Sequence, residues 1–331
     1  MDIEDDPFVK SMPKATMREI TKYEKVINSK ATYCMQQMKA FVNKSQHVIS
    51  EYGGWAGDYY ISTVVASFNQ LILERGDELV GWVDEEKLYL WNILSQVKTF
   101  DVTDRGLLKP GALSPKAETL IGLLVEEYEA DQKRGEQSFS GIVFVEQRVG
   151  VAVLAEILSR HIKTREIFQC GTLVGTSVHS ARTGKSLCEL VDSKVMNTTL
   201  KDFREGNKNL IIATSVAEEG LDVQACHLVV CCYPQTTKKS YVQMRGRARR
   251  VHSTYVLMFE NQDSALEKLA ELDLWEKEML KAYQDERELQ EREEQPGEEG
   301  EEQYHIGETK YVLPTNLIFS RNFQNNTNAH I

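Results

Sequence analysis

The sequence contains a short arginine-rich segment, QMRGRARR, at residues 243–250. A guanidinium group offers its N–H donors as a planar fork that matches phosphate oxygens, and it keeps its positive charge throughout the physiological pH range. Gly246 would let the main chain turn tightly while neighbouring arginines project from it. Charge alone would fit a generic basic surface or a nuclear-localisation patch about as well. The glutamine and glycine at fixed offsets, directly after a predicted strand, favour a phosphate site.

A second candidate cluster is the segment IATSVAEEGLDV at residues 212–223. We expect a buried strand to end at Ala213, which puts Thr214 and Ser215 at its carboxyl end, where ligands of open α/β sheets bind. Their hydroxyls can donate to nucleic-acid phosphates, and Asp222 can accept from a ribose hydroxyl or orient an arginine. Taken alone, however, the segment is better explained as a strand followed by a capped helix with a solvated Asp222.

The elements that would position these clusters follow an α/β pattern. Short runs rich in Ile, Val and Leu alternate with helical segments, which is typical of a parallel sheet sandwiched by helices. The expected strands are 141–145, 172–174, 209–213, 228–232 and 255–259, and the expected helices between them include 151–159 and 193–203.

The rest of the chain is mostly helical in pattern. Apolar residues recur at helical spacing from 17 to 100, and Ser114 can cap a helix whose first residue is Pro115. We divide the chain into a lead-in (1–16), a helical domain of about four helices (17–100), a linker (101–116), an α/β domain (117–262), further helices (263–290), an acidic linker (291–303) and the start of an incomplete segment (304–331).

The charge distribution permits a phosphate-bearing partner. The formal net charge of −11 argues at first against nucleic acid, but ten carboxylates and only two arginines lie between Asp285 and Glu302. Residues 223–259 contain six Lys or Arg and no Asp or Glu. A phosphate backbone responds to such local fields.

Composition excludes several classes of protein. No apolar stretch approaches the ~20 residues of a membrane span, and the N-terminus, MDIEDD, is acidic where a secretory signal would be basic. The six cysteines show neither CxxC pairs nor zinc-ligand spacing, so we expect free structural thiols and no metal site. The expectation is a soluble, intracellular α/β protein, cytoplasmic or nuclear, without a membrane partner.

Together the two clusters resemble motifs V and VI of superfamily 2 helicases. ATSVAEEGLDV at 213–223 followed by QMRGRAR at 243–249 is similar to the second RecA-like lobe of the family that includes Dicer and the RIG-I-like receptors, and IVFVEQR at 142–148 resembles motif IV. Residues 17–100 stand where that family carries a helical insertion, and the helices around Trp275 resemble its pincer helices. The segment GGWA at 53–56 favours a Dicer-like protein over a RIG-I-like receptor.

The resemblance implies a role for individual residues. Arg247 and Arg249 would face the γ-phosphate of ATP with Gln243 nearby, while Arg250, an extra arginine, either substitutes in that site or lies outside it. The nucleotide side would also include Gly220, Asp222 and Gly246, and the residues contacting RNA would be Arg148, Gly175, Thr214 and Ser215. The implied partners are double-stranded RNA, the first RecA-like lobe and, at the insertion, a double-stranded-RNA-binding protein.

The parts that would build an ATP site are missing from these residues. TGKS at 183–186 ends like a phosphate-binding loop, but His179 stands where the pattern requires glycine. There is no complete GxxxxGK[ST] loop and no DExH box, and these first-lobe parts hold Mg²⁺ and the β- and γ-phosphates. The resemblance therefore implies ATP and Mg²⁺ in the two-lobe protein, with none bound tightly by this chain alone. No RNase III signature is present, so RNA cleavage is not assigned.

Two other functions remain open. The chain could be a non-catalytic module that binds RNA or a protein partner. It could also be the second lobe of a helicase that remodels branched DNA, since some of those enzymes carry a helical insertion too. DNA-remodelling relatives commonly have QRxGRTGR at this place. The sequence QMRGRAR lacks the TGR triplet and therefore favours the RNA family.

Overall fold

The computed structural model describes residues 2–73, 83–98, 100, 102–135, 139–174, 187, 197–214, 226–234, 237–248, 252–259, 268, 271, 272, 274, 275, 277, 278, 281, 308–312 and 318–321. The chain forms two compact units. We call Met1–Ala117, Arg148–Ile162 and Gly175–Lys194 the helical unit, and Glu118–Gln147, Lys163–Val174 and Val195–Ile331 the sheet unit.

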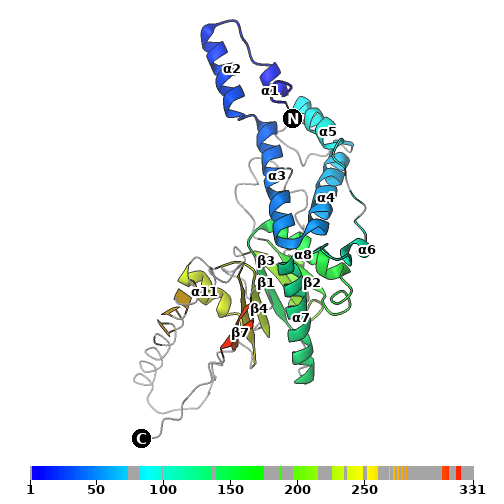
Figure 1. The fold of residues 1–331 in the computed structure, drawn as a ribbon, viewed down its shortest axis with the longest axis vertical. Coiled ribbons are helices and arrows are strands. Elements are labelled where there is room, and N and C mark those ends of the chain that lie inside the picture. The colour runs from blue at the N-terminus through cyan, green and yellow to red at the C-terminus, as the bar shows by residue number, and fades with distance from the viewer. Residues whose placement is uncertain are drawn as a thin grey trace. The chain divides into compact units, whose positions relative to one another are not determined.

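The sheet unit is built on a seven-stranded sheet with the order β2-β3-β1-β4-β5-β6-β7 (Figure 1). Its strands are β1 (Gly141–Val145), β2 (Cys170–Leu173), β3 (Leu210–Thr214), β4 (Leu228–Cys231), β5 (Thr254–Met258), β6 (Glu308–Val312) and β7 (Ile318–Arg321). All neighbours pair in parallel except β6 and β7, which are antiparallel. The predicted α/β parallel sheet is confirmed, and the five expected strands match within two residues. Beyond them, β6 and β7 extend the same sheet next to β5.

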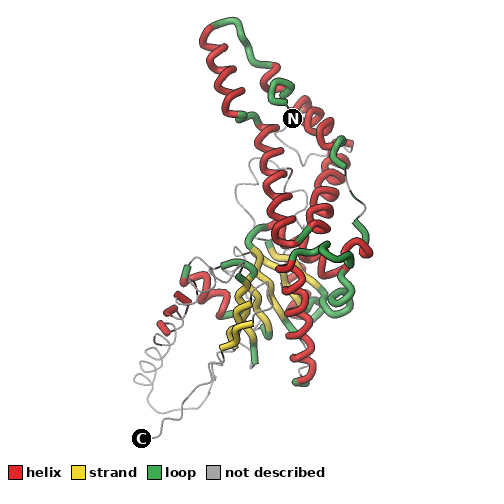
Figure 2. Tube along the Cα trace, in the orientation of Figure 1, coloured by secondary structure: helices red, strands yellow, loops and turns green. Residues whose placement is uncertain are grey.

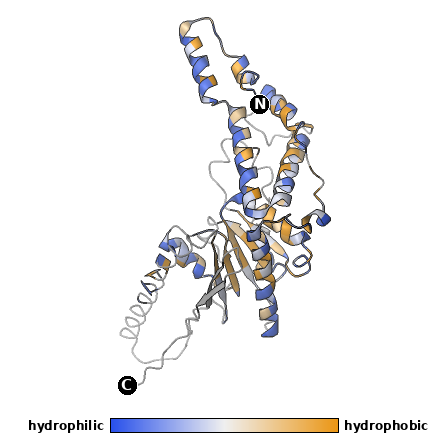
Figure 3. Ribbon diagram, viewed as in Figure 1, coloured by the Kyte–Doolittle hydropathy of each residue, from blue (hydrophilic) through white to orange (hydrophobic). Residues whose placement is uncertain are grey.

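The strands form because their residues are apolar on both faces. Every residue of β1, β3 and β5 is buried, and the strands are coloured as hydrophobic in Figure 3. One face packs against α10 (Asn197–Arg204) and α11 (Lys238–Arg245), through Phe203, Tyr241 and Met244. Tyr241 contacts the ring of Tyr255 edge-on, with centroids 5.7 Å apart. Burial of this kind contributes ~25 cal/mol per Å² of apolar surface and is what holds the sheet between its helices.

The helical unit is organised around a hairpin of two long helices, α3 (Tyr33–Tyr52) and α4 (Gly54–Leu73) (Figure 2). They meet at Gly53, whose φ of +102° favours glycine. A Cβ there would also lie 2.5 Å from the main-chain nitrogen of Ser114. The remaining helices of this unit are α1 (Pro7–Lys10), α2 (Met17–Ser29), α5 (Asp84–Leu94), α6 (Asp104–Leu107) and α8 (Arg148–Arg160).

The predicted helix after the two-proline linker is α7 (Pro115–Lys133). Ser114 caps it as expected, because its Oγ accepts the N–H of Ala117 at 3.1 Å. The same hydroxyl donates to the carbonyl oxygen of Glu51 at 2.6 Å. A single serine thus fixes both the start of α7 and the end of α3.

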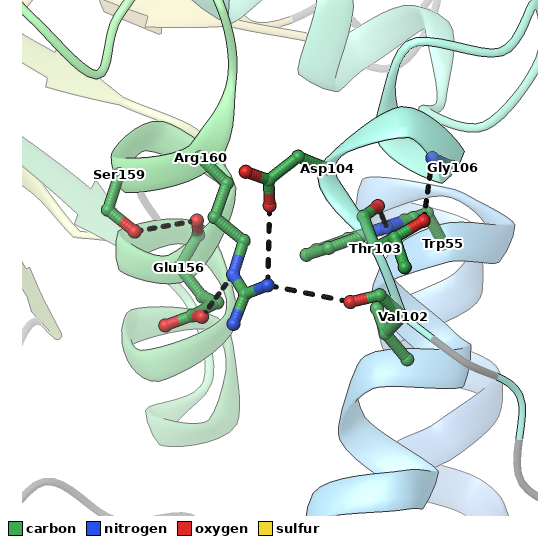
Figure 4. A network of polar contacts seen from close by, with 8 residues as sticks. All are labelled: Trp55, Val102, Thr103, Asp104, Gly106, Glu156, Ser159 and Arg160. Atoms are coloured by element: carbon green, nitrogen blue, oxygen red, sulfur yellow. Dashed lines mark hydrogen bonds and ion pairs between the residues drawn. The ribbon is translucent and has the colours of Figure 1, made fainter.

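A polar network secures the linker before α7 (Figure 4). Arg160, at the end of α8, pairs with Glu156 and, at 3.4 Å, with both Asp104 and the carbonyl oxygen of Val102. Burial lowers the pKa of Arg160, but the hydrogen bond and ion pair with Glu156 outweigh it, so the net pKa is raised. Trp55 adds a 3.0 Å bond from its indole N–H to the carbonyl oxygen of Thr103.

Among the described helices, none combines the length and the apolarity that a membrane span requires.

Candidate functional site

The arginine-rich segment begins inside α11 and continues past its end. Thr237 caps the helix, since its Oγ1 accepts the N–H of Ser240 at 3.2 Å. The helix ends at Arg245, and Gly246 follows with φ −65° and ψ −3°, values that any residue can adopt. The chain turns at Gly246 as expected, although in a conformation that does not require glycine. The N–H groups of Arg247 and Ala248 close this turn by donating to the carbonyl oxygens of Met244 and Arg245 at 3.1 Å.

The two arginines described in this segment have different surroundings. Arg245 is 4% exposed, and its guanidinium lies 5.7 Å from the centroid of the Tyr255 ring. Such a cation–π contact inside the sheet unit makes Arg245 a packing residue. Arg247 is only half-buried, as are Gln243 and Gly246. Arg247 is therefore the more exposed of these two arginines.

A main-chain hydrogen bond fixes Arg247 at one edge of the sheet. The N–H of Cys226 donates to the carbonyl oxygen of Arg247 at 3.0 Å. Cys226 stands two residues before β4, and parallel strands all begin at the same edge. We call this the amino edge. The end of the arginine-rich segment thus meets the start of β4 there.

His227 joins three strands at the amino edge, and sequence reasoning did not single it out. Its Nδ1 lies 3.1 Å from the main-chain nitrogen and 3.0 Å from the hydroxyl oxygen of Ser140, just before β1. Its own N–H donates to the carbonyl oxygen of Ser140, and its carbonyl oxygen accepts from the N–H of Thr254 in β5, at 2.9 and 2.7 Å. The ring stacks on Phe139 at 6.2 Å. The signal available in the sequence was a lone histidine directly before an apolar strand, which usually means only a buried core residue.

Thr214 is the last residue of β3 and so lies at the opposite, carboxyl edge. Its side chain is 2% exposed, and within the described part of the chain its Oγ1 has no hydrogen-bond partner. An unpaired buried hydroxyl costs ~1–3 kcal/mol and is uncommon in folded proteins. The hydroxyl is therefore covered in this structure, yet left available for a bond to a ligand.

Arg148 was expected in a loop after β1. The structure makes it the first residue of α8, and it is half-buried. The helix thus starts three residues before the expected Val151, and Gly150 in its first turn lies close to the side chain of Tyr52 in α3.

The structure brings Gln243, Gly246 and Arg247 together at the end of α11. The remaining predicted residues lie outside the described part of the chain: Gly175, Ser215, Gly220, Asp222, Arg249 and Arg250. The TGKS segment at 183–186 also lies outside it. Within the described residues, no three His, Cys, Asp or Glu side chains are grouped as a metal site would require. The five cysteines described are free thiols.

Comparison of the sequence with known proteins relates the chain to a family of helicases. Residues 115–252 match the helicase conserved C-terminal domain. Dicer-like protein 2-1 of Aspergillus niger is 40% identical over 296 residues, which make up 87% of this chain and 20% of that protein. Dicer-like protein 2 of Neosartorya fischeri is 39% identical over 294 residues, 88% of this chain and 20% of that protein. The chain thus spans about a fifth of the length of these curated relatives.

Among solved structures, the crystal structure of the Pyrococcus furiosus Hef helicase domain aligns with 78% of this chain and 49% of its own. Its sequence identity is 19% and its TM-score is 0.37. The sequence matches are much closer, and the match to the helicase domain covers β1 to β4, α11 and the arginine-rich segment. The chain carries a helicase conserved C-terminal domain and is homologous to one region of fungal Dicer-like protein 2.

Proposed function

We propose that this chain is the second helicase lobe, with a helical insertion, of a double-stranded-RNA-dependent ATPase of Dicer type. In this role it completes an ATP site whose Mg²⁺ and β- and γ-phosphates are held by the first lobe. The observation that carries the proposal is the bond between Cys226 and Arg247, which fixes a half-buried arginine at the amino edge. A guanidinium held there can stabilise the charge that develops on the γ-phosphate, with Gln243 beside it.

The two edges of the sheet suggest how RNA and ATP are coupled. Thr214 closes β3 at the carboxyl edge, while Cys226 precedes β4 at the amino edge. The chain between them connects the two edges covalently. RNA phosphates bound at the carboxyl edge by Thr214 would therefore act on the chain that leads to Cys226 and its bond with Arg247. The family resemblance adds Ser215 and Gly175 to the residues expected to contact RNA, and Gly220 and Asp222 to those expected on the nucleotide side. Contact with phosphates and with duplex shape, and not with base edges, is the usual way double-stranded RNA is bound.

The chain's own contribution to catalysis is electrostatic. Arg247, together with Arg249, would supply fixed positive charge at the transferred phosphoryl group without taking up or losing a proton. Arg250 and Gly246 would line the same side. No complete phosphate-binding loop occurs in these residues, so we expect the chain alone not to bind ATP tightly.

The test is an ATPase assay on the chain alone and with the first lobe of a Dicer-like protein 2 supplied separately, each with and without double-stranded RNA. We expect little hydrolysis by the chain alone and RNA-stimulated hydrolysis by the pair. Arg247→Ala should lower kcat by roughly 100-fold or more, the scale of lost transition-state stabilisation by such groups. Lys238→Ala is the control for the loss of a positive charge, at the first residue of α11. It also breaks an ion pair with Glu278, but both side chains are about half exposed, so that pair should contribute less than ~1 kcal/mol.

The outcome decides between the proposal and its rivals. Hydrolysis that survives Arg247→Ala would contradict the role given to this residue. RNA binding without restored hydrolysis would support a binding module. A preference for duplex DNA over duplex RNA of equal length, at a fixed salt concentration, would support a DNA-remodelling lobe.

A further inference from the structure

The hydrogen bonds around His227 define the state of its ring. A main-chain N–H can only donate, so the 3.1 Å contact from Ser140 makes Nδ1 an acceptor. The Nδ1 lone pair of His227 therefore binds the main chain of Ser140, the residue before β1.

His227 directly follows Cys226, the residue whose N–H bonds to the carbonyl oxygen of Arg247. The peptide bond between Cys226 and His227 is planar, so fixing one residue restricts the direction of the other. The main chain of His227 is also bonded on both sides, to Ser140 and Thr254.

We propose that His227 is a positioning residue for Arg247. By accepting from Ser140 through Nδ1, it fixes the turn before β4, and the Cys226 N–H then keeps the Arg247 carbonyl in place. This fixes the main chain from which the Arg247 side chain extends, and so limits where its guanidinium can reach. The catalytic part of this statement rests on the proposed function, but the link from His227 to the Cys226 N–H does not.

The test uses two variants that differ in the acceptor. In His227→Asn, the amide oxygen stands as many bonds from Cα as Nδ1 does, so the bond from Ser140 can be kept. In His227→Leu, the acceptor is lost and the Ser140 N–H is left unpaired. Ile212→Val serves as a stability control, because it trims the buried core of β3 without touching either bond.

The first readout is amide hydrogen exchange of Cys226 in this chain alone. We expect exchange to be at least about tenfold faster in His227→Leu and within about threefold of the parent in His227→Asn, because a lost hydrogen bond removes local protection. The second readout is kcat and KM for ATP with the first lobe and RNA present. A misplacement of about 1 Å can cost ~100-fold in rate. We expect kcat to fall roughly 10- to 100-fold in His227→Leu with little change in KM, and to be retained in His227→Asn and Ile212→Val.

The proposal would be overturned if a folded His227→Leu protein kept both the parent's slow amide exchange at Cys226 and the parent's kcat. An equal loss of kcat in Ile212→Val at matched stability would also overturn it, since that would indicate a purely structural role. Should the Leu variant not fold, His227→Gln, whose acceptor lies one bond further out, carries the same expectation of faster exchange and lower kcat. Absence of ATPase in the parent pair would refute the proposed function, while the exchange experiment would still decide the link.

Discussion

The hydroxyl of Thr254 donates a 2.9 Å hydrogen bond to the carboxylate of Glu127, and both side chains are almost fully buried, at 2% and 6% exposure. Glu127 belongs to α7 and Thr254 is the first residue of β5. Because the N–H of Thr254 also bonds to His227, this pair connects α7 to the amino edge. The amino edge, where Cys226 bonds to Arg247, is thus also held by α7.

Removing the hydroxyl at Thr254 should destabilise the sheet unit. Thr254→Val keeps the shape of the side chain but takes a donor away from the buried Glu127 carboxylate, which typically costs about 1–3 kcal/mol of unfolding free energy. Thr254→Ser retains the hydroxyl and should cost less. Urea denaturation of the two variants measures the difference. Equal midpoints for Val and Ser would show that the bond contributes nothing.

Two glycine-to-alanine changes should have opposite effects. A Cβ on Gly150 would overlap the hydroxyl of Tyr52, and a group forced into packed surroundings costs about 1–3 kcal/mol. Gly122 lies in the middle of α7 with nothing within 4 Å of its would-be Cβ. Gly122→Ala should therefore stabilise the helix by about 0.5–1 kcal/mol. Thermal melting should show a lower melting temperature for Gly150→Ala and a higher one for Gly122→Ala than for the parent.

Adding Tyr52→Phe to Gly150→Ala provides a check on the cause. It removes the hydroxyl but leaves the ring carbons 3.2 and 3.3 Å from the new Cβ, so rescue should be partial. A Gly150→Ala variant as stable as the parent would mean that Tyr52 moves aside without cost.

The sheet was predictable because its signal is local. Strands buried on both faces are continuous apolar runs, and β1 was predicted at its observed bounds for that reason. β2 starts two residues before the prediction, since Cys170 and Gly171 carry little strand preference and the strand alternates in burial. The contacts that position the site were not predictable in this way. Ser140 and His227 are 87 residues apart in the sequence. The contact of Arg245 with the ring of Tyr255 likewise joins residues from two different elements, so the sequence around Arg245 gives no sign of it.

The network at the end of α8 should protect the linker from proteolysis. The Arg160 side chain is 36% exposed, so its ion pair with Asp104 should contribute less than ~1 kcal/mol to global stability. Its bond to the Val102 carbonyl oxygen nevertheless holds the linker locally. Arg160→Ala should therefore speed subtilisin cleavage near Val102 several-fold while the melting temperature barely changes. Arg165→Ala, which affects only the exposed pair with Glu166, is the control.

The thiol of Cys170 should be unreactive at neutral pH. Burial raises its pKa to about 12, against an opposing effect of Lys208. Because the thiolate is the nucleophile, iodoacetamide should label native Cys170 far more slowly at pH 8 than the same residue in urea, and the native rate should rise about tenfold per pH unit. The proton held by the folded state also contributes stability that is present below about pH 9 and is lost towards about pH 12. Rapid native labelling at pH 8 would contradict the raised pKa.

Replacement of Thr214 by valine tests whether the carboxyl edge binds RNA. Valine has the shape of threonine without the hydroxyl, and the Thr214 Oγ1 is buried without a partner among the described residues. Thr214→Val should therefore keep or raise stability, by up to about 1 kcal/mol, because no hydrogen bond to a described residue is lost. If RNA uncovers this hydroxyl and receives a bond from it, affinity should fall roughly tenfold, the size of a hydrogen bond to a charged group.

The combination of the two measurements makes the Thr214 result specific. A merely structural threonine would lose stability and affinity together on replacement, whereas a ligand-binding one should lose affinity alone. Thr214→Ser keeps the hydroxyl and should bind RNA like the parent, although it loses a buried methyl group and some stability. Fluorescence titration with one RNA duplex at fixed salt measures all three proteins. Unchanged affinity in Thr214→Val would remove Thr214 from the RNA site and leave the carboxyl edge to the residues that follow it.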